Sequence, residues 1–138
     1  VPVAEDKEIE FTIEVKDQVK IEADAKMLQR AFSNLVDNAL KYTPDKGRVH
    51  VDLQRETGGF VVIRVVDTGP GIDPAFFEKI FERFYRAETS RTSPGTGLGL
   101  SFARTVARQH RGDLVVASQL GGGAVFSMRL PDRNIQII

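Results

Sequence analysis

The sequence predicts an α/β fold of two layers, with helices packed on one face of a mixed, largely antiparallel sheet. Two observations lead to this prediction. Segments with the two-residue periodicity of strands come in pairs, and segments with the periodicity of amphipathic helices separate the pairs. No linker or internal repeat divides the 138 residues, which are enough for one sizeable core. We therefore expect one domain over residues 1–138, with loose ends at 1–7 and 132–138.

Composition narrows the possible functions before any motif is considered. The formal net charge is zero, so no overall basic field attracts nucleic acid. Cysteine is absent, which excludes disulfides and thiolate chemistry and fits a cytoplasmic location. No apolar run approaches the roughly 18 residues of a membrane helix, and no signal peptide is visible. Because the chain begins at Val1, we expect a processed protein or a fragment, whose parent can be membrane-anchored.

The first part of the chain predicts two strands and a long helix. Apolar and polar residues alternate from Glu8 to Val15, which predicts a half-buried strand with Ile9, Phe11, Ile13 and Val15 on its buried face, and a second, shorter strand is predicted at Val19–Ala23. Asp24 is a good N-cap for the helix that follows, since its carboxylate can accept hydrogen bonds from free backbone N–H groups. The helix is expected to end near Thr43, because Pro44 disfavours helical geometry in the residue before it.

The middle of the chain predicts a hairpin and a further helix. A strand at Val49–Leu53 leads through a glycine-containing turn at Glu56–Gly59 into Phe60–Val66, which is nearly all apolar and therefore reads as a central strand covered on both faces. Pro74 suits the first turn of a helix that carries several apolar residues up to Phe81.

The last part predicts a mobile loop, a helix and a final pair of strands. Residues 86–96 have almost no apolar content, and Gly97–Gln109 has helical periodicity with Gly112 as its stop. Strands at Leu114–Ala117 and Ala124–Leu130 are joined through three glycines.

Polar residues border the apolar face of the first long helix. The apolar positions of Leu28–Thr43 follow the i, i+3, i+4 pattern of a buried stripe, and Asn34, Asn38 and Lys41 project within one sector beside it. Asparagine is a poor helix former, so two of them beside a lysine indicate a polar site against an apolar wall. The alternative is a pair of boundary amides whose hydrogen bonds are satisfied locally.

The buried strand at Phe60–Val66 is followed by Asp67-Thr68-Gly69-Pro70-Gly71. A carboxylate at this place is costly unless it is hydrogen-bonded, and it can accept from the exocyclic amine of a base. The glycines let the backbone approach a ligand. The alternatives are an ordinary Asx turn and an aspartic protease, which needs a second Asp-Thr-Gly that this chain lacks.

Two more stretches have phosphate-binding character. Gly95-Thr96-Gly97-Leu98-Gly99-Leu100-Ser101 runs into a helix, whose free N–H groups and dipole favour phosphate. It has neither the P-loop lysine nor the dinucleotide-binding spacing. Phe81-Glu82-Arg83-Phe84-Tyr85-Arg86 combines aromatic anchors for the core or a lid with Arg86, which is either a phosphate contact or a solvated surface residue.

Together, the four stretches resemble the N, G1, F and G2 boxes of the ATP-binding catalytic domain of sensor histidine kinases. Their order and spacing match as well, and the resemblance covers Glu8 to Pro131. It implies the Bergerat ATP-binding fold, with ATP and Mg²⁺ as cofactors and protein-histidine kinase activity. The implied partners are an upstream dimerisation domain that carries the phosphoacceptor histidine and the receiver domain of a response regulator. It implies no contact of this segment with nucleic acid or membrane, and a monomeric isolated domain.

The resemblance also assigns roles to residues. Asn38 is similar to the Mg²⁺ ligand and Asn34 to its partner, and Lys41 and Tyr42 resemble phosphate-side contacts. Asp67 resembles the adenine-binding carboxylate, in a pocket shaped by Gly69 and Gly71, and Ile72–Thr96 is similar to the lid over the nucleotide. The implied catalytic residues are Asn38, Lys41 and Arg86. The further nucleotide contacts implied in the lid and glycine-rich loop are Ile72, Arg86, Gly95, Thr96, Gly97, Leu98, Gly99 and Leu100.

The chain departs from the family pattern at two positions and lacks one element. Ala124 stands where threonine is usual, and Arg111 replaces the commoner glycine after His110. Neither His50 nor His110 has the surroundings of a phosphoacceptor, so both are interpreted as structural. Two alternatives remain within the superfamily: an ATP-hydrolysing conformational switch, which has a glutamate where Asn34 stands, and a serine kinase of the anti-sigma-factor type, against which the Phe81–Arg86 box argues.

Overall fold

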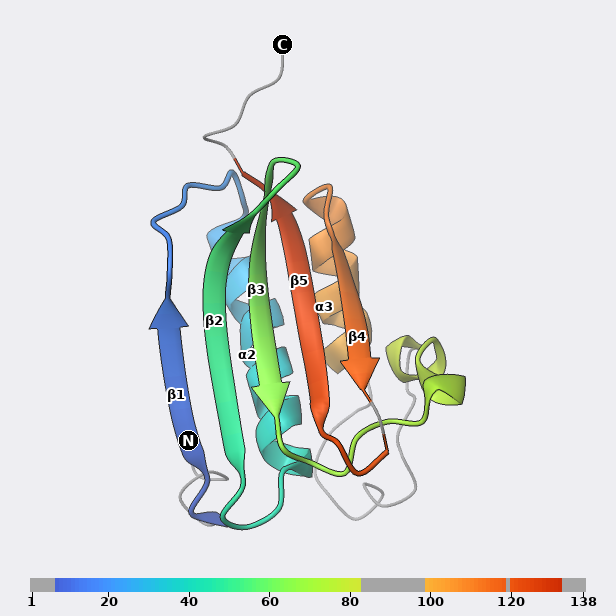
Figure 1. Ribbon diagram of the computed structural model, residues 1–138. Helices are drawn as coiled ribbons and strands as arrows, with labels where there is room; N and C mark the ends of the chain where they lie inside the picture. Colours follow the sequence, from blue (N-terminus) through green and yellow to red (C-terminus); the bar gives the residue numbers. More distant parts are fainter. Residues whose placement is uncertain (1–6, 83–98, 119, 133–138) are drawn as a thin grey trace.

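The computed structural model describes residues 7–82, 99–118 and 120–132, which form a five-stranded sheet backed by two helices (Figure 1). The strands stand in the order β1-β2-β3-β5-β4. β1 pairs with β2 in parallel, and the other three pairs are antiparallel. The predicted fold class is confirmed. In chain order the elements are β1 (Glu10–Val15), α2 (Ala25–Tyr42), β2 (Arg48–Glu56), β3 (Phe60–Asp67), η1 (Pro74–Phe76), η2 (Lys79–Phe81), α3 (Gly99–Gln109), β4 (Asp113–Ser118) and β5 (Ala124–Pro131).

Helix α2 follows its sequence signals closely. The Asp24 side chain accepts from the Met27 backbone N–H at 3.1 Å, as expected of the N-cap. At the other end Thr43 leaves helical geometry just before Pro44, while its hydroxyl donates to the Ala39 carbonyl at 2.7 Å. The helix therefore begins and ends where the sequence predicts.

The core lies between the two helices and one face of the sheet. Both helices contribute small residues to the core, among them Ala31, Ala39, Ala103 and Ala107, which are fully buried. The sheet contributes larger side chains, and these are Val49, Val51, Val65, Leu114, Phe126, Met128 and Leu130. Figure 1 shows both helices behind the sheet, so no helix of the described residues covers the second face of the sheet. The expectation that β3 is covered on both faces was wrong in that respect, although its central position is confirmed.

Two strand predictions need correction at the N-terminal edge. Val19–Ala23 is not a strand, because no strand of the described sheet pairs with it. β1 does form, but the alternating residues Phe11, Ile13 and Val15 are 37%, 61% and 64% exposed rather than buried. They share a face with Val49 and Val51 of β2, yet β1 lies at the edge of the sheet, beside the helix layer rather than under it (Figure 1).

The helix predicted from Pro74 is wrong, whereas the part of the predicted helix Gly97–Gln109 that the structure describes is confirmed. Instead of one helix from Pro74, there are two single 3₁₀ turns, η1 and η2, closed by bonds such as Phe77 N–H to the Pro74 carbonyl. The Asp73 side chain caps the first turn, and burial of Ile80 and Phe81 holds the second. α3 begins at Gly99; Gly97, Leu98 and the loop at 86–96 lie outside the described residues.

Both segments that we assigned to loose ends are anchored at their inner residue. The Lys7 ammonium donates to three backbone carbonyls at the end of α2. The Asp132 carboxylate is buried and accepts from Arg55 Nε at 3.1 Å. Residues 1–6 and 133–138 lie outside the described residues. Among the residues that are described, no helix is long and apolar enough to cross a membrane.

Candidate functional site

Three elements that carry predicted site residues end at the same edge of the molecule: the last turns of α2, the end of β3 and the start of α3 (Figure 1). One hydrogen bond joins two of them directly, because Asn34 Nδ2 of α2 donates to the carbonyl of Gly99 at 3.3 Å. Residues 65 positions apart are therefore held together at this edge. This is the arrangement that the order of the motifs led us to expect.

The polar residues of α2 line one side of this edge. Asn34, Asn38, Lys41 and Tyr42 are all half-buried, beside a stripe of buried apolar residues on the same helix. The Lys41 ammonium lies 5.6 Å from the centre of the Tyr42 ring. A half-buried amide or ammonium keeps donors and acceptors accessible while its stem packs on the core. The structure thus brings these four predicted residues together.

Asp67 lies at the end of β3 and is only 7% exposed. Its Oδ1 accepts from the Gly69 backbone N–H at 2.9 Å. Burial raises the pKa of the Asp67 carboxyl above its ordinary value, and the N–H groups of Gly69 and Ala124 oppose that rise. A carboxyl kept in a poorly solvated place at a strand end is destabilising by itself, which is typical of a functional group.

The glycines after Asp67 are required by close packing. A Cβ at Gly69 would lie 3.0 Å from both the Asp67 Oδ1 and the Tyr42 carbonyl oxygen. Gly71 has a φ of +78°, a conformation that favours glycine. The loop from Asp67 therefore lies directly against the end of α2, which carries Lys41 and Tyr42, the predicted phosphate-side residues.

The loop that Asp67 begins is also held by the turn between β4 and β5. The hydroxyl of Ser118 accepts from the Ile72 N–H at 2.7 Å and donates to the Gly123 carbonyl at 2.6 Å. A Cβ at Gly123 would lie 2.2 Å from the Asp67 carbonyl oxygen. Sequence reasoning missed Ser118, whose only signal is its place at the end of β4, just before the glycine-rich turn.

The third element supplies Gly99 and Leu100, at the first turn of α3. Leu100 packs against the core, and Gly99 faces Asn34. Phe81, the first aromatic of the Phe81–Arg86 box, is a core anchor: its ring meets Phe126 edge-on at 6.3 Å. The remaining predicted contacts, Arg86, Gly95, Thr96, Gly97 and Leu98, lie outside the described residues.

Comparison with known proteins agrees with this geometry. The sequence profile of the histidine kinase-, DNA gyrase B- and HSP90-like ATPases matches residues 23–134. The chain belongs to this family. It is 45% identical over 113 residues to the sensor histidine kinase RppB of Synechocystis sp., an alignment that covers 80% of this chain and 25% of the relative. It therefore corresponds to about a quarter of that sensor kinase.

Solved structures show the same fold. The mycobacterial sensor histidine kinase MprB superposes with a TM-score of 0.84 at 35% identity, covering 96% of this chain and 90% of that one. Full-length ShkA in complex with AMPPNP superposes with a TM-score of 0.83 at 34% identity, covering 95% of this chain and 27% of that one. The chain is thus an ATPase-fold catalytic domain of the kind found in sensor histidine kinases.

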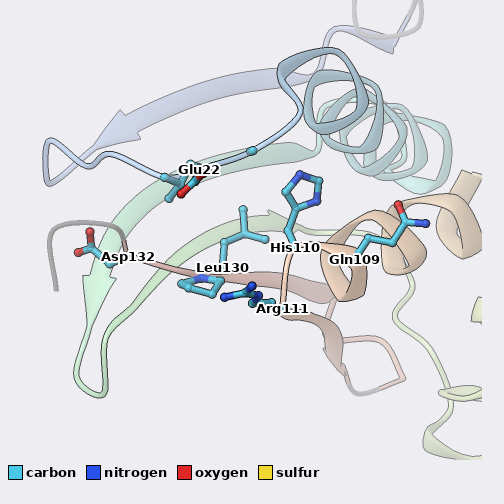
Figure 2. Close-up of a pocket in the computed structure, with 9 residues that line it drawn as sticks. Glu22, Gln109, His110, Arg111, Leu130 and Asp132 are labelled. Atoms are coloured by element: carbon cyan, nitrogen blue, oxygen red, sulfur yellow. The ribbon is translucent and has the colours of Figure 1, made fainter. Parts of the chain in front are cut away.

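A cavity of about 320 Å³ lies at the opposite end of this ATPase-family domain, where α2 begins and where α3 and β5 end (Figure 2). His110 stands at its wall and joins two helices: its Nε2 accepts from the Asp24 N–H at 2.9 Å, and its Nδ1 donates to the Val106 carbonyl at 2.8 Å. Both ring nitrogens thus contact the backbone, which is the structural role that we expected. His50 forms a hydrogen bond across the β1–β2 pair, between its Nδ1 and the Thr12 hydroxyl, at 2.6 Å. Neither histidine lies at the candidate site.

Proposed function

We propose that this domain binds Mg-ATP at the edge formed by α2, β3 and α3 and positions the γ-phosphoryl group for transfer to a histidine outside the domain. ATP supplies the phosphoryl group, and Mg²⁺ neutralises charge on its phosphates. Asp67 would read the adenine amine, and Lys41 and Tyr42 would face the phosphates. The proposal extends to the lid residues Ile72 to Thr96, of which those up to Glu82 are described.

The side chains at this edge fit a metal ion that is held mainly by the nucleotide. Among the described residues, no three His, Cys, Asp or Glu side chains are placed to hold a metal ion together. Mg²⁺ needs few protein oxygens, since phosphate and water complete its octahedron. The half-buried Asn38 amide is the candidate protein ligand on α2.

The observation that favours a kinase over an ATP-hydrolysing switch is the hydrogen bond from Asn34 to Gly99. An amide can donate to this carbonyl at 3.3 Å, whereas a carboxylate cannot donate, and an amide cannot take a proton from water. At this position the chain therefore has a tie between α2 and α3 instead of a general base. The nucleophile would come from outside, as the imidazole of a histidine on a dimerisation domain, and a receiver domain would take the phosphoryl group next.

The decisive experiment combines the purified domain with a dimerisation domain that carries an acceptor histidine. The domain alone should bind ATP and leave it nearly intact, and the mixture should form acid-labile phosphohistidine. Asn38→Ala should abolish the transfer without changing the circular dichroism spectrum, while Gln29→Ala, an exposed change on the same helix, should have no effect. Repeated ATP hydrolysis by the isolated domain, with no transfer to any histidine, would favour the switch instead.

A further inference from the structure

The last turn of α2 is held by a residue outside every predicted motif. Lys7 Nζ donates to the carbonyls of Leu40, Lys41 and Thr43 at 3.2, 2.7 and 3.1 Å. The last carbonyls of a helix have no partner within the helix, and they lie at the negative end of its dipole. An ammonium group with three donors matches both features. Lys7 is therefore the C-terminal cap of α2, supplied by the chain that leads into β1.

The backbone of Lys7 makes a second attachment nearby. Its carbonyl accepts from the Lys46 N–H at 3.0 Å, in the turn that follows α2. This turn is packed tightly, since a Cβ at Gly47 would lie 2.4 Å from Thr43 Cγ2 and 2.9 Å from Thr68 Oγ1. Thr68 directly follows Asp67, and its hydroxyl accepts from the Arg48 N–H at 2.9 Å. One continuous set of contacts thus connects Lys7 with both α2 and the loop after β3.

The carbonyls that Lys7 binds belong to the turn that carries the phosphate-side residues. Lys41 supplies one of them, and Tyr42 lies between two of them in sequence. The Tyr42 carbonyl in turn lies against Gly69 of the adenine-side loop. A shift of this turn would therefore move groups on both sides of the proposed nucleotide.

We propose that Lys7 is a positioning residue for nucleotide binding, which couples the chain entering the domain to the nucleotide-facing end of α2. The inference rests on the proposed function. Lys7 touches no reacting atom; it fixes the direction of the last turn of α2 relative to the loop at Asp67–Gly71. Since catalytic and binding groups must be held within a fraction of an ångström, loss of this cap weakens nucleotide binding more than global stability accounts for.

The test compares Lys7→Gln with three other variants. Lys7→Arg retains the charge and several donors and should restore the wild-type behaviour. Lys20→Gln removes an exposed lysine elsewhere, and Asp132→Asn weakens the pair that buried Asp132 forms with half-exposed Arg55 at the far end of the sheet. In titrations with Mg-ATP, Lys7→Gln should bind about three- to tenfold more weakly. The two control variants should bind as the wild type does, even where Asp132→Asn lowers the melting temperature.

Amide hydrogen exchange separates this role from a general stabilising role. In Lys7→Gln, exchange should accelerate at Ala39–Thr43 and Gly69 and stay unchanged at the first turn of α2. If the wild type binds nucleotide and Lys7→Gln binds it with the same affinity, the inference is overturned. Exchange that is faster by the same factor throughout the domain would also overturn it. If the wild type binds no nucleotide, the proposed function is contradicted. The exchange pattern alone then tests whether Lys7 positions the last turn of α2.

A measurement on the unaltered protein covers the case in which Lys7→Gln fails to fold. Coupling between two sites is reciprocal, so bound nucleotide must stabilise the Lys7 contacts if those contacts favour nucleotide. Mg-ATP should therefore slow the acylation of Lys7 by an amine reagent and leave that of Lys20 unchanged. Equal slowing at the two lysines, or none at Lys7, would count against the inference.

Discussion

At its first residues α2 is held by its own N-cap and by a histidine at the end of α3, whereas at its last residues it is held by an ammonium group and borders a buried carboxyl group. At the first end, the Asp24 side chain caps the helix, and the Asp24 backbone N–H donates to His110 Nε2. At the last end, Lys7 binds three carbonyls, and Asp67 lies nearby with a raised pKa. The contacts at the first end stabilise the helix, whereas the second end keeps costly groups in place, as expected of the proposed nucleotide site.

The largest expected effect is at the site end, for Gly123→Ala. Its Cβ would meet the Asp67 carbonyl oxygen at 2.2 Å, and its φ of +76° disfavours alanine. The two loops would have to separate, so we expect a loss of about 3 kcal/mol or more in the free energy of unfolding. Urea denaturation measures this loss. Gly121→Ala is the matched control, because its φ is similar, at +78°, but no atom lies within 4 Å of the added Cβ. Equal losses in the two variants would show that backbone conformation, rather than loop contact, decides.

The next effect is at the far end, for His110→Ala. The change removes an acceptor for the Asp24 N–H and a donor to the Val106 carbonyl, so we expect a loss of about 1–2 kcal/mol. Nucleotide affinity should stay at the wild-type value, because the changed contacts lie at the other end of α2. His50→Ala, on the open face of the sheet, is the control and should cost less stability. A clear loss of affinity in His110→Ala would mean that the two ends of α2 are coupled.

Asp67→Asn should separate stability from binding. A carboxyl whose pKa is raised by folding stabilises the folded state at low pH, and this contribution is lost as the pH rises through the folded-state pKa. Asparagine does not titrate, so the variant should exceed the wild type at neutral pH by about 1 kcal/mol. The difference should shrink as the pH falls through the raised folded-state pKa, and it should close below the ordinary carboxyl pKa of about 3.9.

Binding by the same variant should change in the opposite direction. An amide presents a donor as well as an acceptor to the base, so Asp67→Asn should lose its preference for ATP over GTP. Thermal unfolding across pH and paired nucleotide titrations provide the two measurements. A variant that is less stable at neutral pH, or that still prefers ATP, would contradict the role of Asp67.

The sequence predicted the site end better than it predicted the edges of the fold. The resemblance of four motifs to the histidine kinase boxes implied one nucleotide site, and the structure brings the last turns of α2, the end of β3 and the start of α3 to one edge. Alternation could not reveal that Phe11 and Ile13 stay exposed, since a two-residue period does not say whether a helix covers that face. Val19–Ala23 has the same period without a partner strand, and pairing is a property of the whole sheet.

Lys7 and Ser118 could not be found from sequence for a different reason. Each acts on backbone groups that lie far away along the chain, such as the Leu40 carbonyl 33 residues beyond Lys7 and the Ile72 N–H 46 residues before Ser118. No spacing rule links a side chain to a distant carbonyl or amide. The single 3₁₀ turns at Pro74–Phe76 and Lys79–Phe81 were missed because a capped, apolar segment looks the same for either helix type.

The smallest expected effect comes from Arg111→Gly. Arg111 has a φ of +67°, a conformation that favours glycine, which is the commoner residue after His110 in the resembling kinases. A side chain in this region costs about 1–2 kcal/mol, which glycine recovers in part because it loses more chain entropy on folding. We expect Arg111→Gly to raise the free energy of unfolding by roughly 0.5 kcal/mol, measured by urea denaturation.

Lys46, with a φ of +65°, is the counterpart at the site end. Lys46→Gly should stabilise by a similar amount, and it should also loosen the turn that Lys7 contacts. Nucleotide affinity should therefore fall slightly in Lys46→Gly and stay unchanged in Arg111→Gly; a loss of affinity in Arg111→Gly would extend the binding function to the far end of α2.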